Sequence, residues 1–350
     1  MINIEKKEFG MYKEEKIYKY ELKGENGFQV NVLNLGGIIT EIFVKNKEGK
    51  VKNVVLGYDN IEKYIDNKAY PGSVIGRTAG RTANASFYID GTEYRLDKNS
   101  GKNSIHGGNQ GFHTKIFDVK ELENGIELSY TSPDGEEGYP GNLEFKIFYL
   151  LDKNRLTLKY EAISDKKTYV NPTNHSYFNL AGNTERNGDE QMLKIEADNV
   201  CELDVDSVPT GRFINVENTA FDLRKGSVIK KGIEKGHPQF EITRAYDHPF
   251  VLNSVEKGKP QITLFSEYSG IEMKVYTIEN TVVIYTGNYL DDMPLFAGEN
   301  DGNKNNRYLG VAVETQDFPN GINEKNFKTD PLNAGEKYHS KTVYEFNIAR

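Results

Sequence analysis

Strict alternation of apolar and polar side chains marks the segment Arg155-Leu156-Thr157-Leu158-Lys159-Tyr160-Glu161-Ala162. Because the side chains of an extended chain point to opposite faces in turn, this pattern predicts a strand with one face in the core. The segments 126–131 (IELSYT), 271–275 (IEMKV) and 344–348 (YEFNI) repeat the pattern. We therefore expect strands from the first half of the chain to its last residues.

Turn residues separate these segments. The runs 45–49 (KNKEG), 90–91 (DG) and 123–125 (ENG) contain Asn, Asp and Gly, which adopt left-handed backbone conformations at low cost and favour hairpins. Tyr and Phe are frequent, at 22 and 18 residues, and both fit a pleated surface. We predict an all-β chain, built as a large antiparallel β-sandwich with few, short helices.

Nothing in the sequence divides the chain into parts. There is no Pro-rich or Ser-rich linker, so we expect a single domain over residues 1–350, and we interpret the polar tract from Asn300 to Asn306 as a surface loop. The sheets of a sandwich pack through their inner faces, about 10 Å apart. The outer faces are then free to carry a functional site.

Composition argues against several kinds of partner. Lys and Arg number 44 against 52 Asp and Glu, which gives a net charge of −8 without a basic run, so we expect no nucleic-acid partner. No stretch approaches the roughly 18 apolar residues of a membrane span, so we expect no membrane partner. The single cysteine, Cys201, cannot close an intrachain disulfide, and the N-terminal residues show no apolar leader pattern. We expect a cytoplasmic protein that is a monomer or a homodimer.

Several familiar catalytic motifs are missing from the sequence. It contains no Gly-x-Ser-x-Gly elbow, no His-Glu-x-x-His, no phosphate loop and no Gly-x-Gly-x-x-Gly after a strand. This disfavours α/β-hydrolases, zincins, P-loop enzymes and Rossmann enzymes. Polar segments that interrupt the alternating pattern remain as candidates for a site, at residues 76–83, 103–108, 171–180, 246–250 and 310–321.

Glu314 lies in the last of these polar segments. Under strict alternation Ala312 and Glu314 share one face of a strand, and Val313 points to the other. One interpretation is a solvated carboxylate on an outer strand, which is the usual place of Glu. The other is a general base, which needs partial burial to raise its pKa from about 4.3 toward the working pH.

Two histidines lie among hydrogen-bonding groups. In a continuous strand Thr173, His175 and Tyr177 would share one face, and His175 is a candidate acid because histidine titrates near pH 6.5. His106 precedes the pair Gly107-Gly108, so it is either a turn histidine or a residue where a ligand approaches the backbone closely. The structural alternative for each histidine is a side chain satisfied by packing or capping.

Other groups of side chains leave the chemistry open at this point. A metal site could draw on His106, His175, Asp247, His248 and Glu314, although none has a familiar zinc spacing. The histidines expected in surface or turn roles are His113, His237 and His339.

Arginine and aromatic side chains also allow two interpretations. Arg77 and Arg81 form either a solvated basic strand end or a fork for hydroxyl or carboxylate groups. Aromatic residues that could form a platform for the apolar face of a sugar, with core packing as the default, are Tyr139, Tyr177, Tyr285 and Phe318.

In their order along the chain, these segments resemble the motifs of the aldose 1-epimerase family, whose members are also called galactose mutarotases. Residues 76–81 (GRTAGR) are similar to the family's G-R-x-x-[N/G]-R segment, and residues 103–108 (NSIHGG) to its N-x-[L/I]-H-G-G. Residues 134–141 (DGEEGYPG) and 171–180 (NPTNHSYFNL) are similar to its D-G-E-E-G-Y-P-G turn and T-N-H-x-Y-F-N-L run. Shorter matches follow at 208–211 (VPTG), 246–248 (YDH), 285–288 (YTGN) and 314–319 (ETQDFP). The resemblance spans almost the whole chain.

The resemblance implies a β-supersandwich enzyme that needs no organic cofactor and no metal, and that interconverts the α and β anomers of free hexoses such as galactose and glucose. It implies that Glu314 is the base that removes the anomeric hydroxyl proton and that His175 is the acid that protonates the ring oxygen. His106 would assist near the anomeric end. The expected substrate-binding residues are Gly80, Arg81, His106, His175, Tyr177, Asp247 and Glu314.

Two positions depart from the family's pattern. Val283 stands two residues before Tyr285, where the family has a substrate-binding Gln, and the resemblance implies that this weakens a contact to a sugar hydroxyl. Gly80 stands where relatives often have Asn. Both changes bear on sugar preference, and we expect catalysis to survive them.

Three alternative functions remain open. A non-catalytic carbohydrate-binding module would keep the aromatic platform without needing Glu314 and His175 together. A hexose-6-phosphate epimerase of the same fold would add a basic cluster beyond Arg81. A metal-dependent lyase or isomerase would lose its activity to a chelator.

Overall fold

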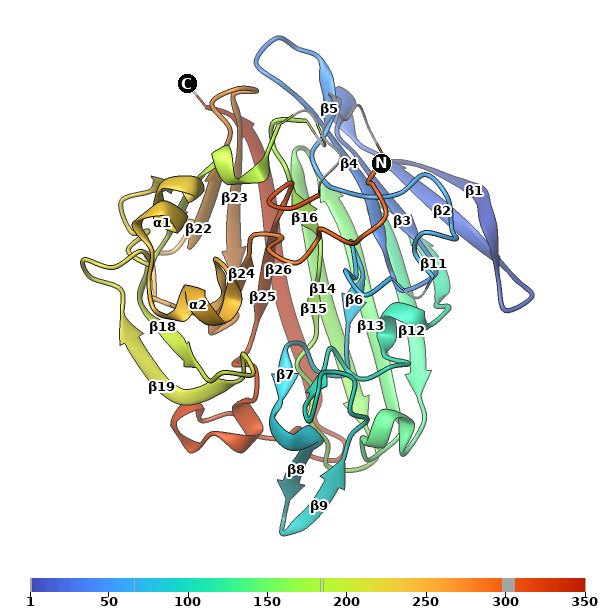
Figure 1. Ribbon diagram of the computed structural model, residues 1–350. Coiled ribbons are helices and arrows are strands. Elements are labelled where there is room, and N and C mark those ends of the chain that lie inside the picture. The colour runs from blue at the N-terminus through green and yellow to red at the C-terminus, as the bar shows by residue number, and fades with distance from the viewer. Residues whose placement is uncertain (1, 66, 183, 185, 298–305, 350) are drawn as a thin grey trace.

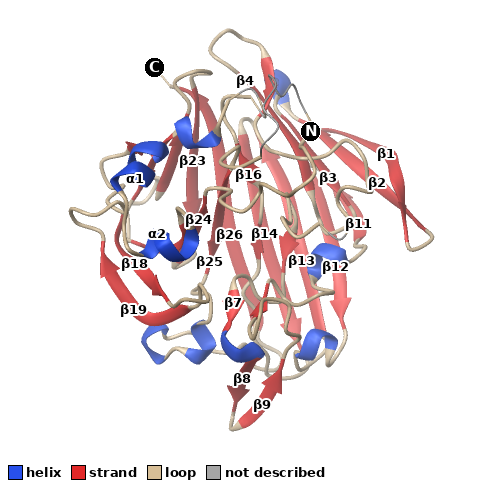
Figure 2. Cartoon of the chain, viewed as in Figure 1, coloured by secondary structure: helices blue, strands red, loops and turns tan. Residues whose placement is uncertain are grey.

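A computed structural model describes residues 2–65, 67–182, 184, 186–297 and 306–349 (Figure 1). Strands dominate these ranges, and the α-helices in them are short: α1 (Ile229–Lys235) and α2 (Gln239–Thr243) (Figure 2). This confirms the predicted all-β chain with few, short helices. Neither helix is long and apolar enough to cross a membrane. Of the predicted loop from Asn300 to Asn306, all but Asn306 lies outside the described residues.

Single turns of 3-10 helix complete the helical structure of the described ranges. They cover Glu25–Gly27, Ala83–Ala85, Phe112–Thr114, Glu136–Gly138, Gly188–Glu190, Gly321–Asn323 and Lys325–Phe327.

The largest sheet is antiparallel throughout and has nine strands. These are β11 (Asp118–Leu122), β12 (Gly125–Ser132), β13 (Leu143–Asp152), β14 (Arg155–Ser164), β17 (Met192–Ile195), β20 (Ser227–Val228), β22 (Ile262–Phe265), β23 (Ile271–Thr277) and β26 (Lys337–Ile348). Their order across the sheet is β11-β12-β13-β14-β26-β23-β22-β17-β20. All four segments predicted from alternation lie here, in β14, β12, β23 and β26, so those predictions are confirmed.

A second antiparallel sheet of six strands carries the residues that matter most for function. Its strands are β16 (Tyr177–Phe178), β18 (Ala197–Leu203), β19 (Pro209–Asn215), β21 (Asp247–Leu252), β24 (Thr281–Tyr285) and β25 (Val311–Gln316). Their order is β16-β25-β24-β21-β18-β19. The central position of β25 and β24 surrounds them with neighbours on both edges.

A five-stranded N-terminal sheet and three short ribbons complete the described structure. The N-terminal sheet runs in chain order through β1 (Asn3–Tyr12), β2 (Glu15–Lys23), β3 (Gln29–Leu33), β4 (Ile39–Lys45) and β5 (Val51–Asn53). The ribbons pair β6 (Val74–Ile75) with β15 (Thr173–Asn174), β7 (Arg81–Thr82) with β10 (Ser104–Ile105), and β8 (Ser86–Ile89) with β9 (Thr92–Arg95).

The predicted turn residues lie where strands reverse. Residues 45–49 link β4 to β5, residues 90–91 link β8 to β9, and residues 123–125 link β11 to β12. In the first of these turns the Asn46 side chain accepts hydrogen bonds from the backbone N–H groups of Glu48 and Lys50. The side chain thus satisfies backbone groups that the ladder leaves free.

One apolar core is shared by the three large sheets. Its members include Val311 and Val313 of β25, Met273 of β23, Tyr344 of β26 and Val30 of β3. Each fully buried side chain of this kind contributes about 1.5–3 kcal/mol of hydrophobic stabilisation. The sheets therefore pack face to face over a common core, which is the arrangement of the predicted sandwich. The shared core supports one domain over residues 1–350, which stays a prediction.

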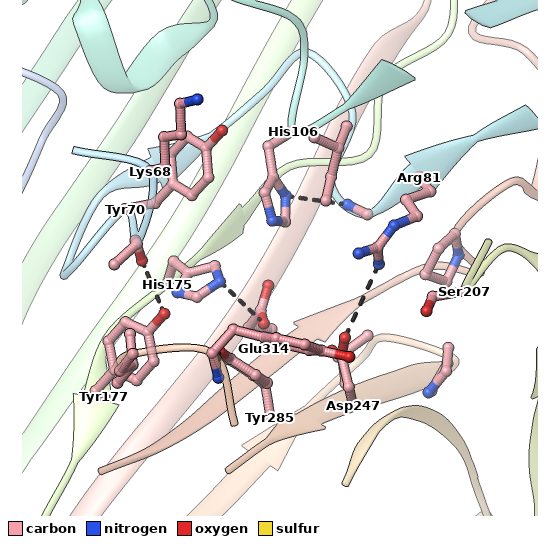
Figure 3. A pocket seen from close by; sticks show the side chains of 18 of the residues that line it. Lys68, Tyr70, Arg81, His106, His175, Tyr177, Ser207, Asp247, Tyr285 and Glu314 are labelled. Atoms are coloured by element: carbon pink, nitrogen blue, oxygen red, sulfur yellow. Dashed lines mark hydrogen bonds and ion pairs between the residues drawn. The ribbon is translucent and has the colours of Figure 1, made fainter. Parts of the chain in front are cut away.

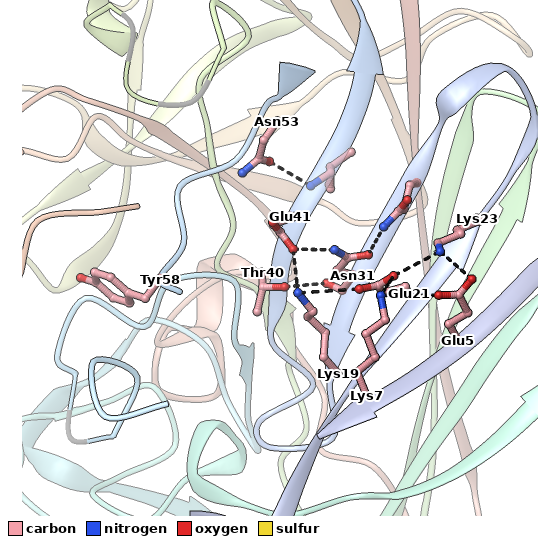
Figure 4. Close-up of polar contacts among 12 residues, drawn as sticks. Glu5, Lys7, Lys19, Glu21, Lys23, Asn31, Thr40, Glu41, Asn53 and Tyr58 are labelled. Carbon is pink, nitrogen blue, oxygen red and sulfur yellow. Dashed lines mark hydrogen bonds and ion pairs between the residues drawn. The ribbon is translucent and has the colours of Figure 1, made fainter. Parts of the chain in front are cut away.

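The outward face of the N-terminal sheet carries a cross-strand network of opposite charges (Figure 4). Lys7 Nζ lies 2.7 Å from the Glu21 carboxylate, and Lys23 Nζ lies 2.7 Å from Glu5. Although burial opposes ionisation of Glu21, Lys7 and Lys23 lower the pKa of its carboxyl group. Pairing across strands keeps this half-exposed face charged and hydrated, so the apolar face of the same sheet is the one that enters the core.

Candidate active site

Glu314 projects from the face of the six-stranded sheet that is turned away from the shared core. Val311 and Val313 of β25 enter that core, whereas Ala312 belongs to a separate apolar cluster on the opposite face. The predicted alternation along this strand is therefore confirmed. Every residue of β25 is buried, and Glu314 is only 3% exposed. The interpretation of Glu314 as a solvated carboxylate is wrong.

A pocket of about 260 Å³ opens over this face of the sheet. Its volume is at the small end of ligand pockets in proteins, which suits a small molecule. All seven residues expected to bind substrate line it: Gly80, Arg81, His106, His175, Tyr177, Asp247 and Glu314 (Figure 3). Residues far apart in the sequence thus meet around one cavity.

His175 and Glu314 face each other within this pocket. The His175 Nε2 atom lies 3.4 Å from Glu314 Oε1. The histidine backbone is fixed on both sides, because its N–H donates to the Ser73 carbonyl at 2.9 Å and its carbonyl accepts from Gly72 N–H at 3.0 Å. Both side chains are nearly inaccessible to solvent. The backbone of His175 is therefore held in place and both side chains are shielded from solvent, as positioned acid–base groups need to be.

The chain around His175 does not form a continuous strand. β15 ends at Asn174 and β16 begins at Tyr177, and the Asn174 side chain accepts from both the N–H and the hydroxyl of Ser176 in the gap. Thr173 does not line the pocket, and its hydroxyl donates to the Thr315 carbonyl at 2.9 Å. The condition of a continuous strand, under which these residues would share one face, is not met, because local side-chain bonds compete with the ladder here.

Burial shifts the pKa values of the pair in opposite directions. It raises the pKa of Glu314 well above the usual value, with Asp247 adding to the rise and Arg81 opposing it. It lowers the pKa of His175 to about 4. Both shifts have the same cause, since desolvation disfavours the charged form of either group. Burial thus favours the neutral form of each group, in which the pair holds a single proton on the carboxyl group.

His106 stands over the pair on a tight turn. It follows β10 with a left-handed φ of 54°, and its ring centroid lies 5.3 Å from that of His175. The backbone N–H of Gly80 donates to His106 Nδ1 at 3.3 Å, which leaves Nε2 as the protonated nitrogen. Burial lowers the pKa of His106, so the ring is a neutral hydrogen-bond donor. His106 is both a turn histidine and a pocket residue.

Gly107 allows two segments of the chain to pack closely, and it does not make room for a ligand. A Cβ atom at this position would lie 1.8 Å from the Gly76 carbonyl oxygen, and the backbone adopts a φ of +79°. The expectation that this glycine admits a ligand close to the backbone is wrong. Another segment of the protein occupies that space, and the glycine lets the His106 turn pack against it.

The two arginines have different roles. Arg81 lines the pocket, where its Nη1 atom lies 3.9 Å from Asp247 Oδ2. Arg77 is 2% exposed and donates to four backbone carbonyls within residues 132–141. A solvated strand end is therefore the wrong interpretation for Arg77, which holds a loop. Burial raises the pKa of Asp247 and the nearby Arg81 opposes that rise.

Several other candidates lie outside the pocket. Tyr139 and Phe318 belong to separate apolar clusters, whereas Tyr177 and Tyr285 line the cavity, so only half of the suggested aromatic platform is present. His248 packs against Phe221, with ring centroids 4.8 Å apart. His113 and His237 are half-buried and His339 is exposed. Within the described ranges, no group of three His, Cys, Asp or Glu side chains has an arrangement suited to a metal ion.

The sequence reasoning missed Tyr70, which forms another wall of the pocket. Its ring stands edge-on to His106 at 4.9 Å between centroids and lies 6.1 Å from His175. Tyr70 adopts a left-handed φ of 52° just before the Pro71-Gly72 turn. That turn signal was available in the sequence, but nothing local indicates that the ring would reach two histidines. Val283 also lines the pocket, at the position where a Gln was expected.

Comparisons with known proteins place this chain among relatives of one family. The sequence model of the family described as Aldose 1-epimerase matches residues 18–345. The galactose mutarotase of Bos taurus is 38% identical over 95% of both chains, and the aldose 1-epimerase of Haemophilus influenzae is 33% identical over 93% of this chain and 94% of its own. The crystal structure of galactose 1-epimerase from Lactobacillus acidophilus superimposes with a TM-score of 0.86 at 27% identity, covering all of both chains.

Proposed function

We propose, on the premise that this chain belongs to the aldose 1-epimerase family and interconverts the anomers of aldoses, that Glu314 and His175 carry the two proton transfers of the reaction. The observation that carries the proposal is their mutual position: a carboxylate and an imidazole, 3.4 Å apart, buried in one small pocket. Ring opening requires one proton to be removed and another to be delivered. Two adjacent titratable groups meet that requirement.

In the proposed reaction the Glu314 carboxylate removes the proton from the anomeric hydroxyl. The C1–O5 bond breaks as the C1 carbonyl forms, and O5 takes a proton from His175. Rotation about C1–C2 presents the other face of the aldehyde. The hydroxyl on C5 then attacks C1, His175 recovers its proton, and Glu314 returns a proton to O1. Neither atoms nor electrons are left over, so the cycle needs no co-reactant.

The free pair favours the number of protons that the proposed reaction needs, although burial places that proton on Glu314. An ionised base beside a protonated acid carries one proton in total, as does a neutral carboxylic acid beside a neutral imidazole. Because burial raises the pKa of Glu314 and lowers that of His175, it favours the state in which the pair holds one proton. A proton that shifts across the 3.4 Å gap as a substrate binds produces the reactive form.

The remaining polar residues are proposed to hold the sugar. His106 offers Nε2–H as a donor near the anomeric end, and Arg81 and Asp247 offer a cation and a carboxyl group for hydroxyls. Charged groups in a partly desolvated cleft make the stronger hydrogen bonds to a neutral polyol. We propose free hexoses such as galactose and glucose as substrates, because relatives carry the name galactose mutarotase.

The cellular setting is proposed on less direct grounds. The single cysteine, Cys201, is buried and free, which fits a reducing compartment such as the cytoplasm. We propose a monomer or a homodimer of one domain over residues 1–350. Size-exclusion chromatography with light scattering measures the oligomeric state directly.

The test is polarimetry on freshly dissolved α-glucose and α-galactose. Wild type should accelerate the approach to anomeric equilibrium, and Glu314→Gln and His175→Asn should each lose about 10²–10⁴-fold of that acceleration. Matched controls are Glu279→Gln, which changes a half-buried carboxyl outside the pocket, and His339→Asn, which changes an exposed histidine. Full activity in both pocket variants, with folding checked by circular dichroism, would refute the roles of Glu314 and His175. A wild-type protein that does not accelerate the change in rotation would instead favour a binding module.

A further inference from the structure

The floor of the pocket contains an apolar residue directly beside the proposed base. Val283 of β24 is the cross-strand partner of Glu314 of β25, and Pro249 of β21 is the partner of Val283 on its other side. Directly paired residues point to the same face of a sheet, with neighbouring strands about 4.8 Å apart. Pro249, Val283 and Glu314 therefore form one row across the floor, and all three line the pocket.

His175 lies at the opposite side of Glu314 from Val283. β16 pairs with β25 on the edge away from β24, in a register that joins Tyr177 to Ala312. Extended by two residues, that register brings His175 beside Glu314, and the 3.4 Å contact agrees with this position. Glu314 is thus flanked by the proposed acid on one side and by an isopropyl group on the other.

This order fixes which part of a pyranose meets Val283. The anomeric carbon bears three heavy-atom neighbours: O1, the ring oxygen O5 and C2. On the proposed function, O1 lies at Glu314 and O5 at His175. C2 leaves the anomeric carbon on the side away from O5, and its substituent is therefore directed along the row toward Val283 and Pro249.

The floor offers no hydrogen bond at that place. The side chains of Val283 and Pro249 carry no polar atom, and a proline has no backbone N–H. Asp247 and Tyr285 form the neighbouring cross-strand pair on the same face of the sheet. They lie two residues from Pro249 and Val283 along their strands, which corresponds to about 6.6 Å between the two rows. A hydroxyl on C2 therefore rests on an apolar surface and gains little from it.

We infer that Val283 makes this enzyme indifferent to the 2-hydroxyl, so that 2-deoxyaldoses form part of its substrate class. The inference rests on the proposed function, because the positions of O1 and O5 orient the ring. Wild type is expected to show kcat/KM values for 2-deoxy-D-glucose and 2-deoxy-D-galactose within about threefold of those for the parent sugars, since no neutral hydrogen bond is lost.

The deciding experiment compares wild type with Val283→Gln and Val283→Leu by polarimetry on these four sugars, with spontaneous rates subtracted. The Gln side chain supplies an amide to the 2-hydroxyl, so the ratio of kcat/KM for the parent to that for the 2-deoxy sugar should rise about 3- to 10-fold over wild type. In Val283→Leu that ratio should stay within twofold. Dividing the ratio measured for the variant by the ratio measured for wild type cancels the intrinsic reactivity of each sugar. 6-Deoxy-D-galactose serves as the control for a change elsewhere on the ring.

Two results would overturn the inference: wild type that disfavours both 2-deoxy sugars more than tenfold but accepts 6-deoxy-D-galactose, or a Val283→Gln ratio that equals that of wild type. A failure of the proposed function looks different, because no aldose would then be accelerated. In that event titration calorimetry on the same sugar pairs tests whether the 2-hydroxyl forms a hydrogen bond at the pocket floor. Equal dissociation constants for parent and 2-deoxy sugar support an apolar contact, and binding of the parent more than tenfold tighter overturns it.

Discussion

Burial of two titratable residues is the central feature of this protein at the scale of single residues. Glu314 and His175 are each less than 5% exposed, and neither has a fixed charge within hydrogen-bonding distance to hold its ionised form. Desolvation is therefore the largest influence on both pKa values, and Arg81 opposes it only in part at Glu314. The same arrangement on an exposed strand would leave Glu fully ionised and His near its ordinary pKa, and the pair would not share a proton.

The pH dependence of kcat/KM is the first prediction at this scale. The pair is active with one proton, so activity falls when a second proton binds and when the last one leaves. Because the pKa of His175 is lowered to about 4, the acid limb should lie below pH 5. Because the pKa of Glu314 is raised, the alkaline limb should lie well above the ordinary range of a carboxyl group. Stopped-flow polarimetry from pH 3.5 to 10 measures both, and an acid limb centred near 6.5 would contradict the buried pair.

The second prediction at this scale concerns the free energy of unfolding of the Glu314→Gln variant. A raised pKa in the folded state means that stability is fully present below the unfolded value of 4.5 and declines as the pH rises through the folded value. The neutral Gln removes this decline. Urea unfolding should therefore show the variant to be more stable than wild type by about 1–2 kcal/mol at pH 8, with a smaller gain at pH 4.5.

The control for that comparison is Glu8→Gln, at an exposed carboxylate paired with Lys16. Its effect on the free energy of unfolding should stay within about 0.5 kcal/mol at both pH values. A Glu314→Gln protein less stable than wild type at pH 8 would show that the ionised carboxylate is compensated.

At the scale of elements, the site combines one regular strand with irregular turns. β25 supplies Glu314 by plain alternation, and this part was predictable because the period of two is a local property of the chain. His175, His106 and Tyr70 come from interrupted or left-handed segments, which alternation does not describe. Motif resemblance could find the two histidines but could not supply their conformation.

Gly107→Ala tests the turn that carries His106. The new Cβ would meet the Gly76 carbonyl at 1.8 Å in a backbone with φ of +79°, so the turn must move. Gly91→Ala is the matched control, since Gly91 has a φ of +80° and a Cβ added there would have no other atom within 4 Å. The control should lose about 1 kcal/mol of unfolding free energy, and Gly107→Ala at least about 2 kcal/mol more.

Activity separates the two glycine variants further. Displacement of the His106 turn should lower kcat/KM at least tenfold in Gly107→Ala and leave Gly91→Ala near wild type, because residues 90–91 lie in a hairpin outside the pocket. Equal losses of stability in the two variants would mean that the backbone angle, and not the contact with Gly76, governs the turn.

At the scale of the whole molecule, the pocket depends on joints between sheets. Arg77 precedes β7, which carries Arg81, and its guanidinium donates to the backbone carbonyls of Ser132, Pro133, Pro140 and Gly141 between β12 and β13. One buried side chain thus ties a ribbon at the pocket to the end of the nine-stranded sheet. Burial lowers the pKa of Arg77 to about 10, so the group remains charged at neutral pH.

Arg77→Met removes this joint while keeping an apolar side chain of similar length. Three buried hydrogen bonds and one half-buried hydrogen bond to backbone carbonyls are lost, so the free energy of unfolding should fall by at least about 3 kcal/mol, and kcat/KM should fall with it as β7 loosens. Arg95→Met, at a side chain that is 81% exposed, should change stability by no more than about 0.5 kcal/mol. Similar stabilities of the two variants in urea would show that the joint carries no net energy.

Local patterns in the sequence by themselves determined the all-β class, the strands β12, β14, β23 and β26, their hairpin turns and the face on which Glu314 lies. These features follow from backbone geometry within a few residues, and the ordered motifs added the identity of the family. Only the tertiary structure decided that His175 and Glu314 stand 3.4 Å apart, that Arg77 is buried while Arg81 lines the pocket, and that Val283 lies beside the base. Such contacts depend on the register between strands far apart in the chain. That register is set by packing of the shared core, which no local pattern encodes.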